Sequence, residues 1–229
     1  MQPIFLNHCV FLFLKMSQKK KLLSPIKIPF LFVTIMWIVK LVEIYNVTSF
    51  SSHGILPRYF LGLKGILFSP FIHADFSHLL NNTYPLIILG WLLFYFYNKI
   101  AIRIFLWIFF IAGIWLWAIG RADFTHIGAS GIIYGLASFI FFSGVINKRT
   151  AFAATSLLVV FLYGSMIWGI LPINKGISWE GHLAGLFAGL LVAIYYKNEG
   201  PKPKRYQWEI DEEIEKIEKT KTNNLYKDI

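Results

Sequence analysis

Long apolar stretches separated by short polar breaks cover most of this chain. Six such stretches lie at about residues 29–44, 77–97, 100–119, 130–146, 151–171 and 180–196. Apolar runs of this length are typical of membrane-spanning helices. The fourth stretch lies at the short end of the length range for membrane-spanning helices. A helix of about 17 residues is only ~25 Å long, whereas the hydrocarbon core is ~30 Å thick. The pattern predicts an all-α membrane protein of six transmembrane helices, with Ser130 several ångströms below the outer surface.

The connection between the first two stretches, at about residues 46–76, has a different character. Glycines and prolines interrupt it, yet it contains apolar clusters such as Tyr59-Phe60-Leu61. We expect a long first loop that lies partly in the outer leaflet, with short helices. Lys40 and Glu43, near the outer end of the first span, are spaced to pair on a helix face. Snorkelling of both side chains into the interface is the simpler interpretation for this pair.

These patterns divide the chain into an N-terminal segment, residues 1–27, a membrane domain, residues 28–196, and a charged tail, residues 197–229. Residues 1–15 lack the basic leader of a signal peptide, and we expect an upstream extension before Met16 or a disordered tail. In the C-terminal tail, Ile210, Ile214 and Ile217 predict a small amphipathic helix, most simply a solvated one.

Composition and charge refine this picture. The chain is 56% hydrophobic and 15% charged, far from the values of a soluble domain. The net charge of +10 does not indicate nucleic-acid binding, because the basic residues are scattered between apolar runs. Thirteen Lys and Arg fall on the side of the N-terminus and four on the other. This positive-inside bias predicts a cell-membrane protein with both termini cytoplasmic. The single cysteine, Cys9, excludes an intrachain disulfide.

Polar side chains gather at one level of the predicted bundle. With this topology, His78, Ser130 and His182 all lie at the outer ends of their spans. Glycines flank the second and third: Gly131 and Gly135 follow Ser130, while Gly181, Gly185 and Gly189 repeat around His182. Small-residue stripes let helix backbones approach closely in lipid. We therefore expect the fourth and sixth spans to pack together and to bring Ser130 beside His182.

Serine next to histidine suggests nucleophilic catalysis. A serine hydroxyl becomes a good nucleophile when a base within about 2.6–3.2 Å takes its proton. Amides at the N-terminus of the fourth helix would help to hold an oxyanion. Asp123 and Glu180 are candidates for a third member by nearness only, so a Ser-His dyad is the simpler hypothesis.

The second span offers further polar groups, with two interpretations each. His78 and Asn82 share one helix face at this depth and could stabilise an oxyanion. Asn82 could equally serve hydrogen bonding between helices. His73 could support the site or anchor the loop, and Tyr134 could stack on His182 or pack in the core.

At these residues the chain resembles the rhomboid family of intramembrane serine proteases. The resemblance runs through His73, the segment from His78 to Asn82, then Gly128-Ala129-Ser130-Gly131 with Tyr134, and finally His182 with Gly185 and Gly189. Three separated motifs occur in the family's order, over residues 28–196. The chain departs from the pattern in one respect, because its first loop lacks the Trp-Arg pair that many members carry.

The resemblance implies a six-helix core with Ser130 as nucleophile and His182 as general base. It also implies an oxyanion hole of His78, Asn82 and the Ser130 amide, with Tyr134 against the base and His73 in support. The fifth span would be a possible gate. The expected substrates are membrane-anchored proteins cut near the outer face, with no cofactor and no metal.

Two other functions fit the composition. A transporter would have charged residues along a path and broken helices at the midplane, but here the polar groups cluster toward one face. A catalytically silent rhomboid-like protein that binds transmembrane helices would not need both Ser130 and His182. The sequence therefore favours a protease, and it leaves the oligomeric state and the substrate open.

Overall fold

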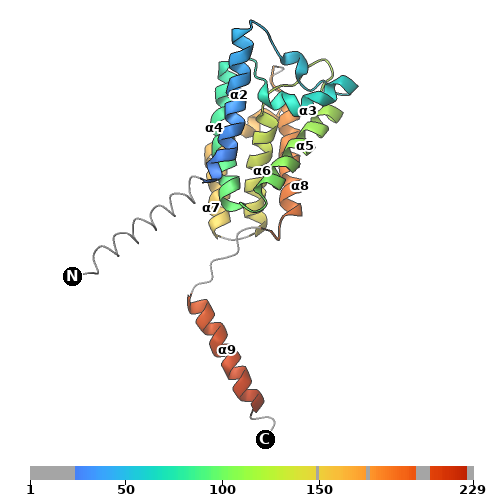
Figure 1. The fold of residues 1–229 in the computed structure, drawn as a ribbon. Helices are drawn as coiled ribbons and strands as arrows, with labels where there is room; N and C mark the ends of the chain where they lie inside the picture. The colour runs from blue at the N-terminus through green and yellow to red at the C-terminus, as the bar shows by residue number, and fades with distance from the viewer. Residues whose placement is uncertain (1–23, 148–149, 174–175, 200–206, 226–229) are drawn as a thin grey trace, which may run out of the picture.

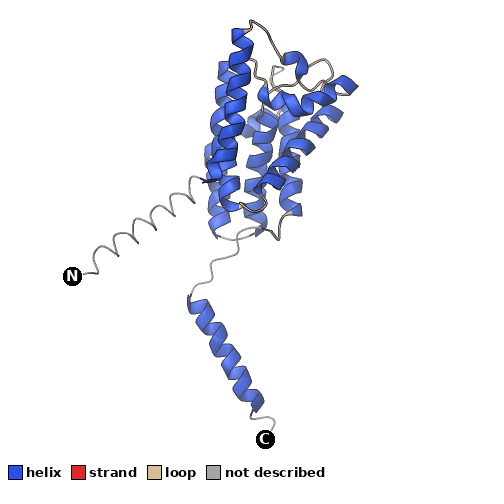
Figure 2. Ribbon diagram, viewed as in Figure 1, coloured by secondary structure: helices blue, strands red, loops and turns tan. Residues whose placement is uncertain are grey.

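The described chain folds into a bundle of helices. The computed structural model describes residues 24–147, 150–173, 176–199 and 207–225. In Figure 1 the long helices of the bundle stand side by side. They are α2 (Lys27–Tyr45), α4 (Phe76–Phe96), α5 (Ala101–Ile119), α6 (Ser130–Asn147), α7 (Thr150–Tyr163) and α8 (Trp179–Tyr195). Figure 2 shows that the described residues form helices and loops. Within these residues, one isolated β-bridge pairs Ile55 with His126.

The shorter elements lie between these helices or at the ends. A 3-10 helix, η1 (Ser24–Ile26), leads into α2. The α2–α4 connection holds η2 (Ser51–His53), η3 (Phe60–Lys64), α3 (Gly65–Phe68) and η4 (Ser69–Phe71). The 3-10 helix η5 (Gly164–Ile170) follows α7, and α9 (Gln207–Leu225) contains the amphipathic pattern expected in the tail. The expectations for residues 1–15 lie outside the described residues.

Four of the described helices are long and apolar enough to cross a membrane: Ser24–Tyr45, Phe76–Phe96, Ala101–Ile119 and Ser130–Asn147. Large apolar side chains remain exposed on them, including Phe30 and Leu31 on α2 and Trp107 on α5. An apolar exterior of this kind suits lipid contact. The chain is thus an all-helical integral membrane protein. The α8 helix has 17 residues and α7 has 14, so the count of six spans stays a prediction.

The fifth predicted stretch differs from the expectation of one continuous span. Residues 151–171 were expected to form a single helix, but α7 ends at Tyr163 and the chain tightens into η5 from Gly164 to Ile170. Pro172 has no backbone N–H to donate and disfavours an α conformation in the residue before it, so the end of this stretch cannot be regular α-helix. None of the residues of η5 is buried. This short segment therefore rests on the bundle rather than inside it.

Glycines set the distance between α6 and α8. A Cβ built on Gly185 would collide with the backbone carbonyl of Gly131. One turn deeper, a Cβ on Gly189 would collide with the carbonyl of Gly135. Only hydrogen at these positions permits such an approach of two backbones. The two stripes read from the sequence therefore face each other in the structure.

The first loop docks on the α5–α6 region without a Trp-Arg pair. The guanidinium of Arg58 donates to the carbonyl of Gly120 at 2.8 Å. The indole of Trp117, on α5, donates to the carbonyl of Tyr59 at 2.9 Å. Ile55 and His126 exchange two backbone hydrogen bonds of 2.9 Å. These contacts anchor the first loop to α5 and to the loop before α6.

The simpler interpretation of Lys40 and Glu43 is wrong. The two side chains do pair at 3.2 Å, but neither extends to the interface, since their exposed fractions are 12% and 4%. The Lys40 ammonium also donates to the carbonyls of His73 and Ala74, at 2.9 and 3.0 Å. Glu43 accepts from the amide of Phe50 at 2.7 Å. The pair therefore clamps both ends of the first loop to α2, because a buried charge requires several partners.

Candidate active site

Ser130 and His182 meet where α6 and α8 begin. Nε2 of His182 lies 2.8 Å from Oγ of Ser130. Ser130 is the first residue of α6, while His182 stands in the first turn of α8 and is 8% exposed. The glycine contact between Gly131 and Gly185, next to both residues, brings the two helix ends this close. The pairing expected from the glycine stripes is therefore present in the structure.

The second nitrogen of His182 also has a partner. Nδ1 lies 2.8 Å from the backbone carbonyl oxygen of Gly169, in η5. A carbonyl oxygen can only accept a hydrogen bond, so Nδ1 carries the proton in the neutral imidazole. Nε2 then presents its lone pair to the Ser130 hydroxyl. This is the tautomer that a general base requires.

Tyr134 stacks on the histidine. Its ring lies parallel to that of His182, with centroids 4.1 Å apart and an interplanar angle of 8°. Its hydroxyl donates to the carbonyl of Met166, in η5, at 2.6 Å. Of the two interpretations of Tyr134, the structure shows the stack on His182.

His78 reaches the site through Gly128. A Cβ on Gly128 would lie 2.7 Å from Cε1 and Nε2 of His78. Gly128 also has φ of +101°, a conformation that favours glycine. A glycine two residues before Ser130 thus gives the His78 ring room beside the start of α6.

Asn82 and His73 surround His78. The Asn82 amide donates to the backbone carbonyl of His78 at 2.9 Å, which uses one of its two N–H hydrogens. The His73 ring packs edge-on against that of His78, with centroids 5.0 Å apart. Burial, with the nearby His78 adding to it, lowers the pKa of His73 to about 3. His73 is therefore a neutral packing partner of His78 at physiological pH.

A second polar cluster, which the sequence did not predict, joins the loop before α6 to the start of α8. The Arg121 guanidinium pairs with the Glu180 carboxylate, with 2.5 Å between Nε and Oε1, and also donates to the carbonyl of Ile177. The ring of His126 lies 2.6 Å from Oγ of Ser178 and 3.2 Å from the carbonyl of Arg121. Because the carbonyl must accept from Nε2, the serine hydroxyl donates to Nδ1. We call these four side chains the outer polar cluster: Arg121, His126, Ser178 and Glu180.

The structure shows the surroundings of Glu180 and Asp123, the two acids that lie near the pair in the sequence. Glu180 is 3% exposed and its carboxylate is held by Arg121, while Asp123 is exposed in the loop. The hydrogen-bond acceptor at Nδ1 of His182 is instead the Gly169 carbonyl. Burial lowers the pKa of His126, in keeping with a neutral ring between Ser178 and Arg121. The four side chains thus tie the loop before Ser130 to the start of α8. Ser178 and Glu180 precede His182 by four and two residues, and Arg121 and His126 precede Ser130 by nine and four.

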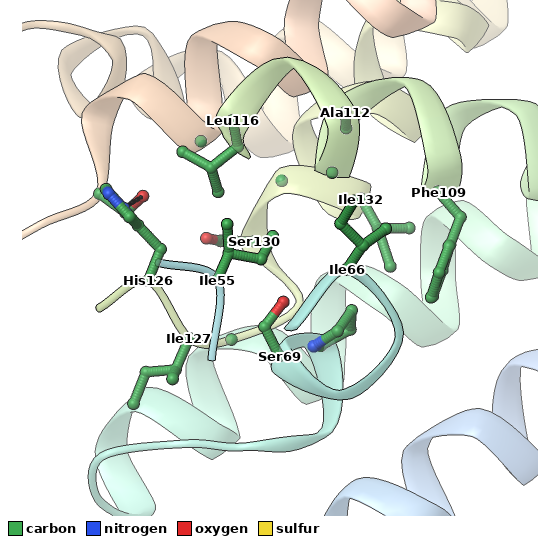
Figure 3. Close-up of a pocket in the computed structure, with 16 residues that line it drawn as sticks. Ile55, Ile66, Ser69, Phe109, Ala112, Leu116, His126, Ile127, Ser130 and Ile132 are labelled. Carbon is green, nitrogen blue, oxygen red and sulfur yellow. Dashed lines mark hydrogen bonds between the residues drawn. The ribbon is translucent and has the colours of Figure 1, made fainter. Parts of the chain in front are cut away.

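A small cavity lies on the loop side of Ser130. Figure 3 shows Ser69 of the first loop and Ser130 of α6 on its wall, with Ile66 and Leu116. Its volume is about 40 Å³, far below the 300 Å³ or more that is typical of small-molecule pockets. The amide of Gly128 donates to the Ser69 carbonyl at 2.8 Å, which ties η4 to the segment before Ser130. No cofactor-sized space adjoins the serine in this cavity.

Fold and site together define a polytopic α-helical membrane protein with a serine–histidine pair at one end of two glycine-packed helices. The family model described as Rhomboid domain matches residues 62–199. Uncharacterized proteins of Mycobacterium bovis and Mycobacterium tuberculosis are each 33% identical over 174 residues, 71% of this chain and 71% of the relative. An uncharacterized protein of Mycobacterium leprae is 32% identical over 176 residues, 71% of this chain and 67% of its own. The chain belongs to the rhomboid family.

Proposed function

We propose that this chain is an intramembrane serine endopeptidase that cleaves membrane-anchored proteins near the outer face of the membrane. The observation that carries the proposal is the 2.8 Å separation between Nε2 of His182 and Oγ of Ser130. Members of the rhomboid family are generally serine intramembrane proteases, which supports the same reaction class. The position of Ser130 on α6, a helix long and apolar enough to cross a membrane, and of His182 on the shorter apolar helix α8 supports membrane-anchored proteins as the substrate class.

The roles follow from the hydrogen bonds. His182, with its proton on Nδ1, takes the Ser130 proton at Nε2 while Oγ attacks the scissile carbonyl. The imidazolium then returns that proton to the leaving amine, and water releases the acyl group by the same route in reverse. The carbonyl oxygen becomes an oxyanion held by the Ser130 amide at the start of α6, with His78 and Asn82 as side-chain donors. Asn82 keeps one N–H hydrogen for this role.

The orientation in the membrane is part of the proposal. Six spans, α2, α4, α5, α6, α7 with η5, and α8, would leave both termini cytoplasmic. The excess of Lys and Arg on the N-terminal side supports this orientation. The pair of Ser130 and His182 would then face the outer leaflet, below the surface and within reach of water.

Variants of Ser130 and His182 test the proposal in two assays, cleavage of a reporter protein and labelling of the chain by a fluorophosphonate. In proteoliposomes with a single-span reporter protein, Ser130→Ala and His182→Ala should each abolish cleavage, and Ser130→Ala should also lose labelling by a fluorophosphonate. Ser138→Ala is a matched control, because Ser138 lies on α6 and donates to the Leu186 carbonyl of α8 at 2.6 Å, away from the pair. It should keep cleavage.

Persistence of cleavage in Ser130→Ala would exclude the mechanism. A parent chain that binds reporter helices, takes no fluorophosphonate and cuts nothing would instead favour the catalytically silent binder. Equal loss in Ser130→Ala and Ser138→Ala would show that helix packing, rather than the nucleophile, had been disturbed.

A further inference from the structure

Two backbone carbonyls of η5 hold the groups around the catalytic base. The carbonyl of Gly169 accepts from Nδ1 of His182 at 2.8 Å. The carbonyl of Met166, three residues earlier, accepts from the Tyr134 hydroxyl at 2.6 Å. Tyr134 stacks on His182, so one carbonyl of η5 holds the imidazole directly and the other holds the ring that packs against it. A segment outside α6 and α8 thus takes part in the geometry of the pair.

A histidine base depends on the acceptor at its second nitrogen. In serine hydrolases with a third member, a carboxylate fixes the tautomer of the imidazole and stabilises the imidazolium that forms. Here the Gly169 carbonyl occupies that place, and Glu180 is engaged by Arg121. The carbonyl dipole also points its negative end at the ring, so it favours the protonated state reached during attack.

Only glycine permits this contact. A Cβ on residue 169 would overlap the Tyr134 hydroxyl and lie 3.1 Å from Nδ1 of His182. Tyr134 cannot easily move away, because its ring is stacked on the histidine and its hydroxyl is bonded to η5. Any side chain at this position must therefore displace η5 or the histidine.

The segment is weakly held elsewhere. None of the residues of η5 is buried, and Ile167 and Trp168 are 52% and 66% exposed. A 3-10 helix has poorer hydrogen-bond geometry than an α-helix. Segments with few buried contacts open at low free-energy cost. The contacts with His182 and Tyr134, together with the packing of Met166 against the core, thus seat η5 on the bundle.

We propose that Gly169 is a positioning residue, and that η5 aligns the base only when it is seated on α8. Its carbonyl holds His182 in the tautomer that accepts the Ser130 proton. Displacement of η5 from α8 would break this hydrogen bond and leave Nδ1 of His182 without its acceptor. This inference rests on the proposed protease function.

Three variants test the inference in proteoliposomes with a reporter substrate. Gly169→Ala should lower kcat by about tenfold or more, because it removes one hydrogen bond to a group that is charged in the transition state. KM should stay equal or fall. Gly164→Ala is the matched control, because its Cβ would meet only Val160 Cγ1, at 3.8 Å. It should keep the kcat of the parent. In a Tyr134→Phe background, which removes the overlapping hydroxyl, Gly169→Ala should cost only about two- to threefold.

The outcomes separate the inference from the function on which it rests. A parent chain without cleavage or fluorophosphonate labelling fails the proposed function itself. If the parent is active and Gly169→Ala cleaves as fast or faster, η5 is a barrier to substrate and the positioning role is wrong. An effect confined to KM, or an equal loss in both backgrounds, also overturns it. Should Gly169→Ala fail to fold, the comparison in the Tyr134→Phe background still decides.

Discussion

Replacing Gly185 by alanine should separate α6 from α8 and with them the two reacting groups. The built Cβ overlaps the carbonyl oxygen of Gly131 and lies 2.9 and 3.2 Å from its carbonyl carbon and Cα. Backbone cannot rotate aside as a side chain can, so the helices must part by about 1 Å to regain van der Waals contact. The distance between Ser130 Oγ and His182 Nε2, now 2.8 Å, would then exceed hydrogen-bond reach.

The magnitude follows from this displacement. A shift of about 1 Å in a catalytic pair costs about 10²-fold in rate, and overpacking costs about 1–3 kcal/mol of stability. Gly131→Ala is the matched control at the same helix contact, since its Cβ would lie 3.2 Å from the Gly181 carbonyl and needs only a few tenths of an ångström. The gain in helix propensity, about 1 kcal/mol in a helix interior, favours Gly185→Ala inside α8 over Gly131→Ala at the second residue of α6, so it cannot cause a larger loss at Gly185.

Reporter cleavage in proteoliposomes and thermal unfolding in detergent measure the two effects. We expect kcat/KM to fall about 10²-fold in Gly185→Ala and less than about tenfold in Gly131→Ala. Parental cleavage and parental stability in Gly185→Ala would refute the idea that the glycine contact sets the distance between Ser130 and His182. A larger loss in Gly131→Ala than in Gly185→Ala would refute it as well.

Three further predictions concern the groups around the pair. His78→Ala and Asn82→Ala should each lower kcat by about 10²–10³-fold with KM little changed, because each would remove one proposed oxyanion donor. A parental kcat in either variant would return that residue to a structural role. Lys40→Met should lower the unfolding temperature more than the double change with Glu43→Gln, because the single change leaves a buried carboxylate without its cation. The pKa of His73 is about 3 in the folded chain and 6.5 in the free side chain, so protonation opposes folding. The parent should therefore lose about 1.4 kcal/mol of stability per pH unit as the pH falls below 6.5. His73→Phe should lose less stability between about pH 7 and pH 4.5. An identical pH dependence of unfolding in parent and His73→Phe would contradict it.

The sequence predicted those parts of the site that depend on regular helices. Glycines every four residues imply one close helix face, and a serine and a histidine beside the first glycine of each face must then approach. The bounds of α4, α5, α6 and α8 lie within one residue or so of the predicted spans, because apolar runs ended by Asn, Gly or Lys are strong local signals. His182 and Ser130 could therefore be paired without coordinates.

Contacts made by the backbone or across long loops could not be predicted in this way. Gly169 acts through its carbonyl, which every residue has, and nothing in the sequence distinguishes it from Gly164 in the same stretch. Lys40 was placed with Glu43 by their helical spacing, but its other partners are carbonyls 33 and 34 residues away. Arg121 and Glu180 are 59 residues apart, and only the docking of the loop before α6 on α8 shows that they pair.

The membrane setting explains why a carbonyl rather than a carboxylate faces Nδ1 of His182. The imidazole of His182 is 8% exposed, so a carboxylate beside it would lose its water at a cost of several kcal/mol. That cost would apply whenever the histidine is neutral and gives the carboxylate no opposite charge. A peptide carbonyl fixes the same tautomer and carries no net charge to desolvate. The buried acid two residues before His182, Glu180, is instead paired with Arg121, whose side chain is 31% exposed. The charges of Glu180 and Arg121 thus compensate each other in the outer polar cluster, while a backbone dipole aligns the proposed catalytic pair.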